Sequence, residues 1–474
     1  MLFCSLVYSY GFLYFIKGGG RLNMNCNANL KQGDCLNLMK ELSADSVDCI
    51  VSDPPYQLSS ITKKRTDQTR EGSYGKEVPF SRVQSKIKGF MGKNWDVLPS
   101  VEILKEANRV LKPGSFAFWL MTPRQDSQLE FLLRLREAEF IISFSGIYWY
   151  YNSGFPKALN ISKAVDRKLG IESDVIGIAK GMAKQNPEFN GTAQGRKENY
   201  LKPEYEKTIP TSEEAKRLTG SYAGFQPKPS VEVIIVSMKP LSEDCYTDQA
   251  LKNGKGITWL NNCRIPYAND NDKKSAIYGK DSPIKIAWSN SKDHKGENNN
   301  RLASEIGRFP ANLLVTDNAL GNFSKYFDLD AWWTDRVKKL PEDVQKTFPF
   351  LYSPKASSSE RNKNLDSFEK KKIDYDSLSR INKETADKFG GERMAIMQNH
   401  HPTVKPLILM SYLITLGSCE GDTIMDPFMD SGTTGISSLL LYRKFIGFEM
   451  NEDYFKIANQ RINGNNCTLD LHGD

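Results

Sequence analysis

The sequence predicts an α/β protein built on a mostly parallel sheet, and two features of the 474-residue chain carry this prediction. From Met24 to Tyr150, and again from His401 onward, short apolar runs of strand length alternate with longer runs of helical spacing. Such alternation predicts a parallel-dominated sheet with helices on both faces. The stretch between them is polar and irregular, with Gly, Pro, Lys and Asn in residues 151–229. We therefore expect one α/β core interrupted by a large insert of different composition.

The first part of the core begins with an apolar run at Val47–Ser52, which predicts a buried strand that ends at Asp53. Apolar residues at helical spacing in residues 99–111 predict a helix, and Pro113-Gly114 ends it. The other elements expected in this part are a strand over residues 115–121, a helix over 128–138, and strands over 140–150 and 231–238.

The second part of the core begins with an apolar helix at Leu407–Leu416. The elements expected after it are a strand at Thr423–Met425, a helix at Ile436–Tyr442, a strand at Lys444–Phe448 and a helix at Glu452–Ile462. Between residues 240 and 390, the strongest strand pattern is Asn312–Thr316. Few other strands are expected in that region.

Charge and composition narrow the class of protein. With 39% hydrophobic and 26% charged residues, the chain has an ordinary globular composition, and its net charge of +7 favours a polyanionic partner. Between Ile61 and Lys93, nine basic side chains stand against three acidic ones. The eight cysteines are scattered without a CxxC pair, so neither a zinc site nor a disulfide framework is expected. A reducing, cytoplasmic location fits this pattern.

The ends of the chain are expected to lie outside the core. The apolar start, Met1–Ile16, lacks a preceding basic segment and is shorter than the roughly 20 residues that span a bilayer, so no membrane partner is expected. Gly18-Gly19-Gly20-Arg21 suits translation of a ribosome-binding site, which makes Met24 the expected start and residues 1–23 an extension. Residues 467–474 are expected to be a tail.

Two short strings stand far apart in the chain. The first follows the strand Val47–Ser52 and is Asp53-Pro54-Pro55-Tyr56. The second follows the strand Thr423–Met425 and is Asp426-Pro427-Phe428-Met429-Asp430-Ser431-Gly432-Thr433-Thr434-Gly435. Together they resemble the catalytic and cofactor motifs of amino-group DNA methyltransferases, in the order found in the β-group of that family. The resemblance implies a Rossmann-like, S-adenosylmethionine-dependent fold with circularly permuted motif order and an inserted target-recognition domain.

The first string has the groups that methylation of an exocyclic base amine requires. Such an amine is a poor nucleophile because its lone pair is delocalised into the ring. The Asp53 carboxylate and the Pro54 carbonyl can accept hydrogen bonds from the amine, and Pro54 and Pro55 restrict the backbone that presents them. Tyr56 can stack on a base rotated out of the duplex. The alternative is a proline-stiffened loop in which Asp53 caps a helix or forms a salt bridge.

The resemblance also implies a set of residues for the S-adenosylmethionine pocket. A glycine turn between a strand and a helix points backbone amides at the cofactor's carboxylate. The turn residues implied are Asp426, Phe428, Asp430, Ser431, Gly432 and Thr433. Glu449 is suited to the ribose hydroxyls, and Lys405 belongs to a segment that completes the pocket. Asp34 would face the adenine; its alternative role is to cap the helix Leu36–Leu42.

Asp430 departs from the family pattern, which has glycine at this position of the turn. Aspartate tolerates a positive φ better than most residues but worse than glycine. Its charge would lie near the cofactor's carboxylate, and nearness to the sulfonium would only partly offset that repulsion. A reduced or lost cofactor affinity therefore stays open.

The DNA-contacting part is expected in two regions. Basic residues after the catalytic turn suit phosphate contacts, although a solvated loop is the alternative; they are Lys63, Lys64, Arg65, Arg82, Lys86 and Lys88. Residues 57–89 and 151–229 read as insertions in the catalytic half, residues 24–239. Strings such as Gly154–Lys163 and Gly307–Asn312 resemble phage and prophage adenine methyltransferases. We expect residues 240–390 to recognise the target and residues 391–466 to form the cofactor half.

The resemblance implies a site-specific DNA methyltransferase that moves a methyl group from S-adenosylmethionine to adenine N6 in double-stranded DNA by direct displacement. An aspartate at the head of the first string favours adenine. Cytosine-N4 methylation stays an alternative, as does a catalytically impaired DNA-binding homologue disabled at Asp430. A cognate restriction endonuclease and a homodimer are further partners that the family suggests.

Overall fold

The computed structural model describes the core of the chain and several shorter pieces. The described residues are 27–56, 96–151, 158–180, 184–185, 200–201, 204–225, 227, 230–276, 304–316, 320–338, 358–362, 364–365, 368, 371–374, 394–399, 401 and 404–463. The expectations for residues 1–23, 57–89 and 467–474 lie outside them. The chain divides into two compact units, residues 1–152 with 231–474, and residues 153–230.

The first unit is built on an eight-stranded sheet with the order β1-β14-β13-β2-β3-β9-β4-β10. In that order the strands are Ala28–Gln32, Lys444–Glu449, Thr423–Asp426, Cys49–Ser52, Phe116–Met121, Val231–Met238, Ile147–Tyr150 and Leu313–Val315. β9 runs antiparallel to both of its neighbours, and the other seven strands are parallel to one another. The sheet confirms the expected α/β fold of methyltransferase type.

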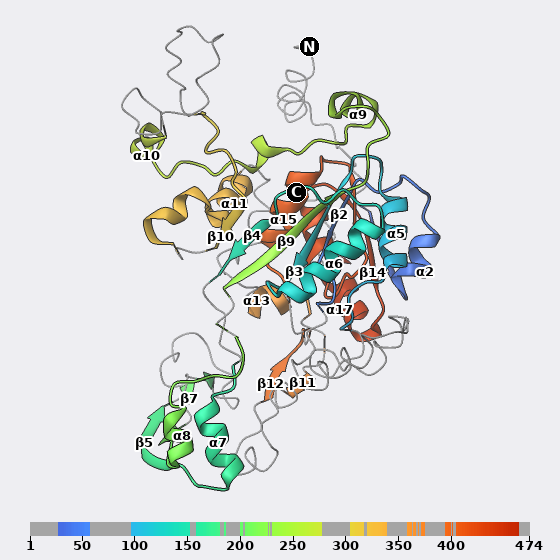
Figure 1. Cartoon of the computed structure of the whole chain (residues 1–474). Coiled ribbons are helices and arrows are strands. Elements are labelled where there is room, and N and C mark those ends of the chain that lie inside the picture. Colours follow the sequence, from blue (N-terminus) through green and yellow to red (C-terminus); the bar gives the residue numbers. More distant parts are fainter. Residues whose placement is uncertain are drawn as a thin grey trace, which may run out of the picture. The chain divides into compact units, whose positions relative to one another are not determined.

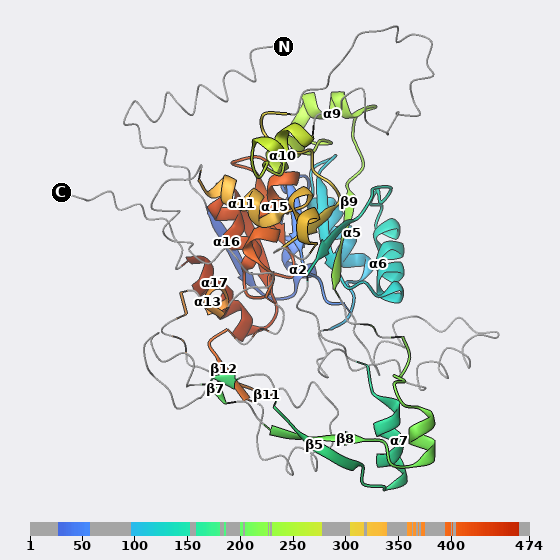
Figure 2. The same ribbon diagram turned by 90° about the vertical axis from the view of Figure 1, so that its left-hand side faces the viewer.

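Helices cover both faces of this sheet, as Figures 1 and 2 show. On one face, α2 (Cys35–Lys40), α5 (Val101–Val110) and α6 (Gln125–Glu137) bury an apolar cluster against the strands. On the other face, the helices that pack on the strands are α11 (Leu329–Val337), α15 (Leu407–Gly417), α16 (Thr433–Leu440) and α17 (Glu452–Asn463). The sheet is therefore buried on both sides, which explains why its central strands read as continuous apolar runs.

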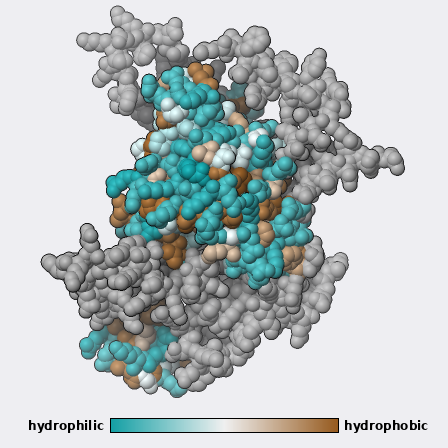
Figure 3. Space-filling model, turned by 90° about the vertical axis from the view of Figure 1, so that its right-hand side faces the viewer, coloured by the Kyte–Doolittle hydropathy of each residue, from teal (hydrophilic) through white to brown (hydrophobic). Residues whose placement is uncertain are grey.

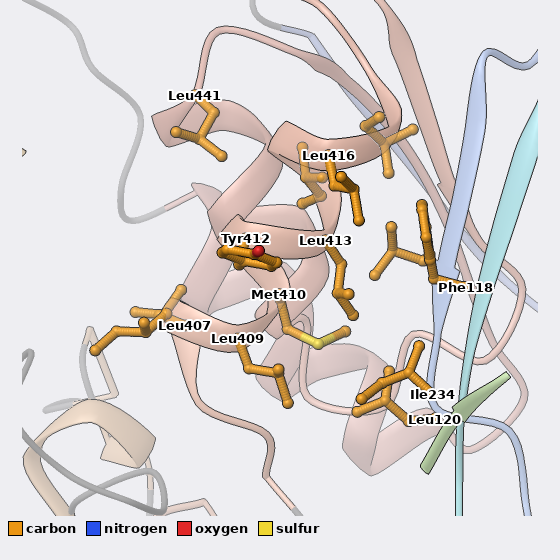
Figure 4. Packing of buried hydrophobic residues seen from close by; sticks show 14 of the residues in the cluster. Phe118, Leu120, Ile234, Leu407, Leu409, Met410, Tyr412, Leu413, Leu416 and Leu441 are labelled. Carbon is orange, nitrogen blue, oxygen red and sulfur yellow. The ribbon is translucent and has the colours of Figure 1, made fainter. Parts of the chain in front are cut away.

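Helix α15 is buried along its whole length. Figure 4 shows its side chains packed among Phe118 and Leu120 of β3 and Ile234 of β9. At the end of the helix, a Cβ added at Gly417 would lie 2.6 Å from the Phe118 ring and 2.8 Å from the Cys49 sulfur. A helix that is apolar all round needs such a buried place. Its position fixes the segment just before it, which contains Lys405.

The sheet brings together two halves of the core that are far apart in the sequence. β13 pairs in parallel with β2, with Ile424 opposite Cys49 and Met425 opposite Ile50. Because parallel neighbours end at the same edge of a sheet, the loops that follow Ser52 and Asp426 lie side by side. The two strings therefore meet at one edge, where open α/β sheets bind ligands.

The strand expected over residues 140–150 is shorter in the structure, and this expectation was wrong. Ile141 bridges Met238, whereas β4 begins only at Ile147, opposite Ile234. Five residues lie between Ile141 and Ile147, but only three lie between their partners, Met238 and Ile234. The two extra residues leave the ladder as a bulge, so the pairing restarts in a new register.

The region between residues 240 and 400 contributes short elements to the first unit. They are α9 (Tyr246–Asn253), η3 (Leu260–Cys263), α10 (Asp270–Ser275), η4 (Gly321–Tyr326), α13 (Ser358–Asn362), β11 (Lys371–Asp374) and β12 (Met394–Met397). β11 pairs antiparallel with β12. From the same region, β10 extends the main sheet beside β4, and α11 packs on α15. Part of the expected target-recognition region is thus continuous with the core.

The second unit is small and holds few buried apolar side chains among its described residues. Its elements are α7 (Ile161–Leu169), β5 (Asp174–Lys180), β6 (Lys184–Gln185), β7 (Tyr200–Leu201), β8 (Glu204–Ile209) and α8 (Glu213–Arg217). β5 pairs antiparallel with β8. The buried Asp166 accepts hydrogen bonds from the backbone amides of Thr211 and Ser212, and from the Ser212 hydroxyl at 2.5 Å. These bonds, the Ser212 hydroxyl first, lower the pKa of Asp166 and tie α7 to the start of α8.

Hydrophilic side chains cover much of the described surface on one face of the molecule (Figure 3). Figure 3 shows one face on which hydrophilic side chains predominate and apolar ones are scattered among them. Among the described residues, no helix combines the length and apolar character required to cross a membrane.

Candidate active site at the sheet edge

The side chain of Asp426, the last residue of β13, connects the two motifs through a hydrogen bond with Ser52, the last residue of β2. The Asp426 side chain is buried and accepts hydrogen bonds from the hydroxyls of Ser52 at 2.6 Å and Thr434 at 2.7 Å. The backbone amide of Phe428 donates to the same carboxyl at 3.1 Å. Burial raises the pKa of Asp426 to about 7, although the two hydroxyl bonds oppose the shift. In this arrangement the side chain anchors the turn that follows β13.

Asp53 lies at the centre of a compact polar cluster. Its Oδ1 accepts a hydrogen bond from the Tyr56 hydroxyl at 2.5 Å, and its Oδ2 accepts one from the Lys405 ammonium. Lys405 Nζ also donates to the Tyr56 hydroxyl at 3.0 Å and lies 5.3 Å from the centre of that ring. Pro54 is buried and Pro55 is half-buried, so the turn that presents this cluster is held by packing as well as by proline geometry.

The cofactor string adopts the backbone that its glycine pattern predicts. Asp430 has φ of 52° and Gly432 has φ of 83°, so the position where the family has glycine does use the left-handed region. The Asp430 amide donates to Glu449 Oε2 at 3.0 Å, and the Asp430 carboxyl lies 3.3 Å from His401 Nε2. Because the departure from glycine falls at a positive φ, it carries a conformational cost as well as a charge.

Gly432 allows close packing between the turn and helix α17. A Cβ at this position would lie 2.9 Å from Ile462 Cδ1 and 3.2 Å from the Ala458 Cα. From the same helix, the buried Arg461 donates to the Ser431 hydroxyl at 3.0 Å and to the Glu360 carbonyl at 3.2 Å. The backbone around Ser431 is therefore fixed from the α17 side.

The carboxyls of the turn lie close enough to perturb one another. Burial and then Asp430 raise the pKa of Glu449 to about 7. Burial, followed by the charge of Asp53, raises the pKa of Asp430 well above its usual range, although its side chain is 30% exposed. Burial lowers the pKa of His401 to about 4, so this imidazole is neutral at pH 7. The pocket therefore carries more acid groups than cations, an arrangement that suits a cationic ligand.

Lys405 stays charged in this surrounding. Burial opposes its charged form, but Asp53 and then Glu232 outweigh that effect and raise the pKa of the ammonium.

The sequence analysis assigned Lys405 to the cofactor pocket. In the structure it lines a small pocket together with Asp430 and Ser431, while its ammonium contacts the catalytic string. The other residues lining this pocket are Asp53, Val404, Met410, Asp426, Phe428, Met429, Thr433 and Thr434.

Asp34 and Glu449 lie at neighbouring strand ends. β1 pairs in parallel with β14, and the Gly33 amide donates to the Glu449 carbonyl at 3.0 Å. The exposed Asp34 side chain caps α2 by accepting a hydrogen bond from the Asn37 amide at 3.1 Å. Glu449 accepts backbone amides from Asp430 and, at 2.8 Å, from Asn451. The capping role expected as the alternative for Asp34 is thus present.

Sequence reasoning did not single out Glu232 of β9, which the structure places beside the site, 3.5 Å from Lys405 Nζ. The Tyr454 ring packs edge-on against His401, with 4.5 Å between the ring centres. Glu232 had a readable signal, because it is the one charged residue in the strand VEVIIVSM. The basic residues expected to contact DNA lie outside the described part of the chain; they are Lys63, Lys64, Arg65, Arg82, Lys86 and Lys88.

The fold and the site together indicate the class of protein. A mostly parallel sheet with one antiparallel strand, an acidic residue at the end of β14 and a glycine turn after β13 are features of the S-adenosylmethionine-dependent methyltransferase fold. The sequence matches the model of the DNA methylase family, N6_N4_Mtase, over residues 47–460. The chain therefore belongs to this family.

Individual relatives match over shorter stretches. Type II methyltransferase M2.DpnII of Streptococcus pneumoniae is 37% identical over 99 residues, which are 20% of this chain and 37% of that protein. DNA adenine methyltransferase YhdJ of Escherichia coli is 43% identical over 63 residues, 13% of this chain and 21% of that protein. The matches thus span well under two thirds of the relatives' lengths.

Among solved structures, the PvuII cytosine-N4-specific DNA methyltransferase aligns with a TM-score of 0.39 at 12% identity. The alignment covers 93% of this chain and 88% of that chain.

Proposed function

We propose that this chain transfers a methyl group from S-adenosylmethionine to N6 of adenine in double-stranded DNA. The observation that carries the proposal is the position of Asp53, at the carboxyl end of β2 and beside the glycine turn of β13. This position puts a hydrogen-bond acceptor for the amine next to the place where the family binds its methyl donor. The match of residues 47–460 to the DNA methylase family supports the reaction class.

In this proposal Asp53, the Pro54 carbonyl and Tyr56 act on the target base. Asp53 and the carbonyl accept hydrogen bonds from the two amine protons, which turns the nitrogen lone pair out of conjugation with the ring. Tyr56 stacks on the base after it has rotated out of the duplex. Direct displacement leaves one proton of the amine to be lost, and the Asp53 carboxylate, which accepts a hydrogen bond from the amine in this proposal, can take it. Pro55 keeps the loop extended.

The pocket residues fit S-adenosylmethionine in their charge and backbone. Burial, and then the charge of a neighbouring carboxyl, raise the pKa of Asp430 and of Glu449, and a sulfonium and an ammonium group would offset the repulsion between these acid groups. When bound, the cofactor supplies the electrophilic methyl group. In this proposal Glu449 binds the ribose hydroxyls and Asp34 faces the adenine edge. The residues of the turn that would hold the amino acid part are Asp426, Phe428, Ser431, Gly432 and Thr433, with Lys405 at the rim.

The remaining parts of the chain receive roles in the same proposal. Residues 57–89 carry the basic side chains for phosphate contacts, and residues 240–390 read the target sequence. The bacterial type II relatives favour a cytoplasmic enzyme working beside a cognate restriction endonuclease. Because β-group enzymes commonly dimerise, a homodimer belongs to this proposal as well.

Mass spectrometry of nucleosides tests the reaction. Purified protein is incubated with S-adenosylmethionine and unmethylated bacterial DNA, which is then digested to nucleosides. We expect N6-methyladenine with the wild-type chain and at least a 100-fold lower rate with Asp53→Asn, which is the scale of loss for a group acting on the reacting atom. Binding of S-adenosylmethionine by the variant serves as the folding control and should persist. N4-methylcytosine instead would reassign the base.

A second candidate function follows from Asp430. An acidic side chain at a positive φ, in the turn that should meet the cofactor's carboxylate, favours a homologue that binds DNA without turnover. Calorimetry separates the two candidates. Duplex DNA binding with no detectable heat from S-adenosylmethionine would support the binding protein and contradict the enzyme.

A further inference from the structure

Glu232 is a charged residue in an otherwise apolar strand and is directed at the catalytic cluster. β9 lies between β3 and β4 in the sheet, and Glu232 is opposite Trp149 in the register. The Glu232 side chain is 17% exposed, and its Oε2 lies 3.5 Å from Lys405 Nζ. A carboxylate in such a place loses most of its hydration, so its retention requires a partner. Lys405 is one such partner.

The ammonium of Lys405 also forms a hydrogen bond with Asp53. Lys405 donates to Asp53 Oδ2, and the Tyr56 hydroxyl donates to Asp53 Oδ1 at 2.5 Å. Both oxygens of Asp53 therefore already accept a hydrogen bond, and the lysine charge balances that of the carboxylate. An acceptor in this state polarises an incoming amine weakly. Each oxygen keeps a second lone pair, but withdrawal of Lys405 would leave Oδ2 and the uncompensated carboxylate charge to the base amine.

We propose that Glu232 is a positioning residue that takes over Lys405 when a target amine binds to Asp53. This inference rests on the proposed function, because it requires an amine at Asp53. The existing separation of 3.5 Å becomes a hydrogen bond after a short movement of Nζ, which the rotatable lysine side chain allows. The ammonium remains paired at each stage, so no buried charge is left alone.

The neighbouring groups favour Glu232 over the other carboxyl near Lys405. Asp430 also faces the ammonium, but its carboxyl lies 3.3 Å from His401 and its amide is bound by Glu449. Glu232 and Lys405 also act on the Tyr151 hydroxyl: burial and then Glu232 raise the pKa of Tyr151 to about 12, and Lys405 opposes the shift.

A crystal structure of the full-length Asp53→Asn variant tests the exchange without requiring activity. This substitution removes the charge that holds Lys405 and keeps the shape of the side chain. We expect Lys405 Nζ to lie about 2.8 Å from a Glu232 oxygen, the usual length of a charged hydrogen bond. An ammonium that stays on the carboxamide at position 53, or that turns toward solvent, would overturn the proposal.

Kinetics of Glu232→Gln supply the second test. With Lys405 confined to Asp53, we expect kcat to fall at least about tenfold, while KM for S-adenosylmethionine changes less than about twofold. Asp48→Asn is the matched control, because Asp48 is a buried carboxylate 2.8 Å from Lys255, before the start of β2 and away from the catalytic turn. Thermal melting of both variants reports any general loss of structure.

The outcomes separate this proposal from the proposed function. A Glu232→Gln variant as fast as the wild type would contradict the positioning role while leaving the methyltransferase assignment intact. Equal losses of kcat in Glu232→Gln and Asp48→Asn would reduce Glu232 to a structural residue and would also contradict it. If the wild-type chain methylates nothing, the proposed function fails, and the Asp53→Asn structure still decides where Lys405 goes.

Discussion

Replacing Asp430 with glycine is expected to strengthen cofactor binding, and the pH dependence of the gain identifies its cause. Asp430 raises the pKa of Glu449 to about 7, second only to burial. With that pKa, Glu449 is about half ionised at pH 7 and about one-tenth ionised at pH 6. A neutral carboxyl is a poorer acceptor for ribose hydroxyls. Removing the Asp430 carboxyl takes away the second cause of the raised pKa, so a larger fraction of Glu449 is ionised over this range, although burial remains.

The size of the effect follows from these fractions. If the ionised form of Glu449 binds the cofactor, full ionisation would set upper limits on the gain of Asp430→Gly, about twofold in affinity at pH 7 and about tenfold at pH 6. Because burial still raises the pKa of Glu449 in the variant, the gain lies below these limits. Backbone strain contributes little to stability, because the relief of φ at 52° is about 1 kcal/mol and the extra freedom of unfolded glycine costs about as much. Affinity should therefore change while the melting temperature stays nearly constant.

Isothermal calorimetry with S-adenosylmethionine at pH 6, 7 and 8 measures this gain. Asp430→Asn is the matched control, since asparagine tolerates a positive φ but cannot ionise. In both variants the decline in affinity below pH 7 should be weaker than in the wild type. Equal or weaker binding by Asp430→Gly at pH 6 would refute the reasoning, and a gain in Asp430→Gly alone would assign the effect to backbone strain.

Two further predictions concern the turn itself. Gly432→Ala is expected to lower the free energy of unfolding by about 2–4 kcal/mol, because the new Cβ combines a positive φ with overlap against Ile462. Gly421→Ala is the matched control: Gly421 has the same φ of 83° but open space around it, so the loss should be only about 1 kcal/mol. Equal losses in urea denaturation would contradict this prediction. Asp426 has a folded-state pKa of about 7, above its unfolded value, so the folded protein binds the extra proton and stability should fall as pH rises from about 4 to about 7. Asp426→Asn should flatten that decline in denaturation curves taken at pH 5 and pH 8, and an unchanged slope would show that Asp426 is not its source.

The core of the fold was predictable because burial on both faces leaves a strong local signal. The strand at Val47–Ser52 and the helix at Leu407–Leu416 are apolar runs of the length that their elements need, and both are present in the structure. The second unit gave no such signal. Its described part is organised around the hydrogen bonds of Asp166 to Thr211 and Ser212, and polar networks of this kind leave no periodicity in the sequence.

The site was predictable as two motifs but not as a set of contacts. Each motif carries its own local signature, a proline-stiffened carboxylate in one and a glycine turn in the other. The contact between Asp53 and Lys405 joins residues 352 positions apart, and the approach of Glu232 depends on where β9 enters the sheet. Sequence spacing contains neither fact. The positive φ of Asp430 was foreseen from the glycine pattern, whereas its bond to Glu449 came only from the fold.

Single-molecule sequencing of genomic DNA from a methylation-deficient bacterial host that expresses this chain tests the central claim most directly. The measurement reports the modified base, its position and its sequence context together. We predict N6-methyladenine at one recurring sequence in cells with the wild-type chain, and none in cells with Asp53→Asn at equal protein level. An unmodified genome in the presence of folded wild-type protein would contradict the assignment of this chain as an active adenine methyltransferase.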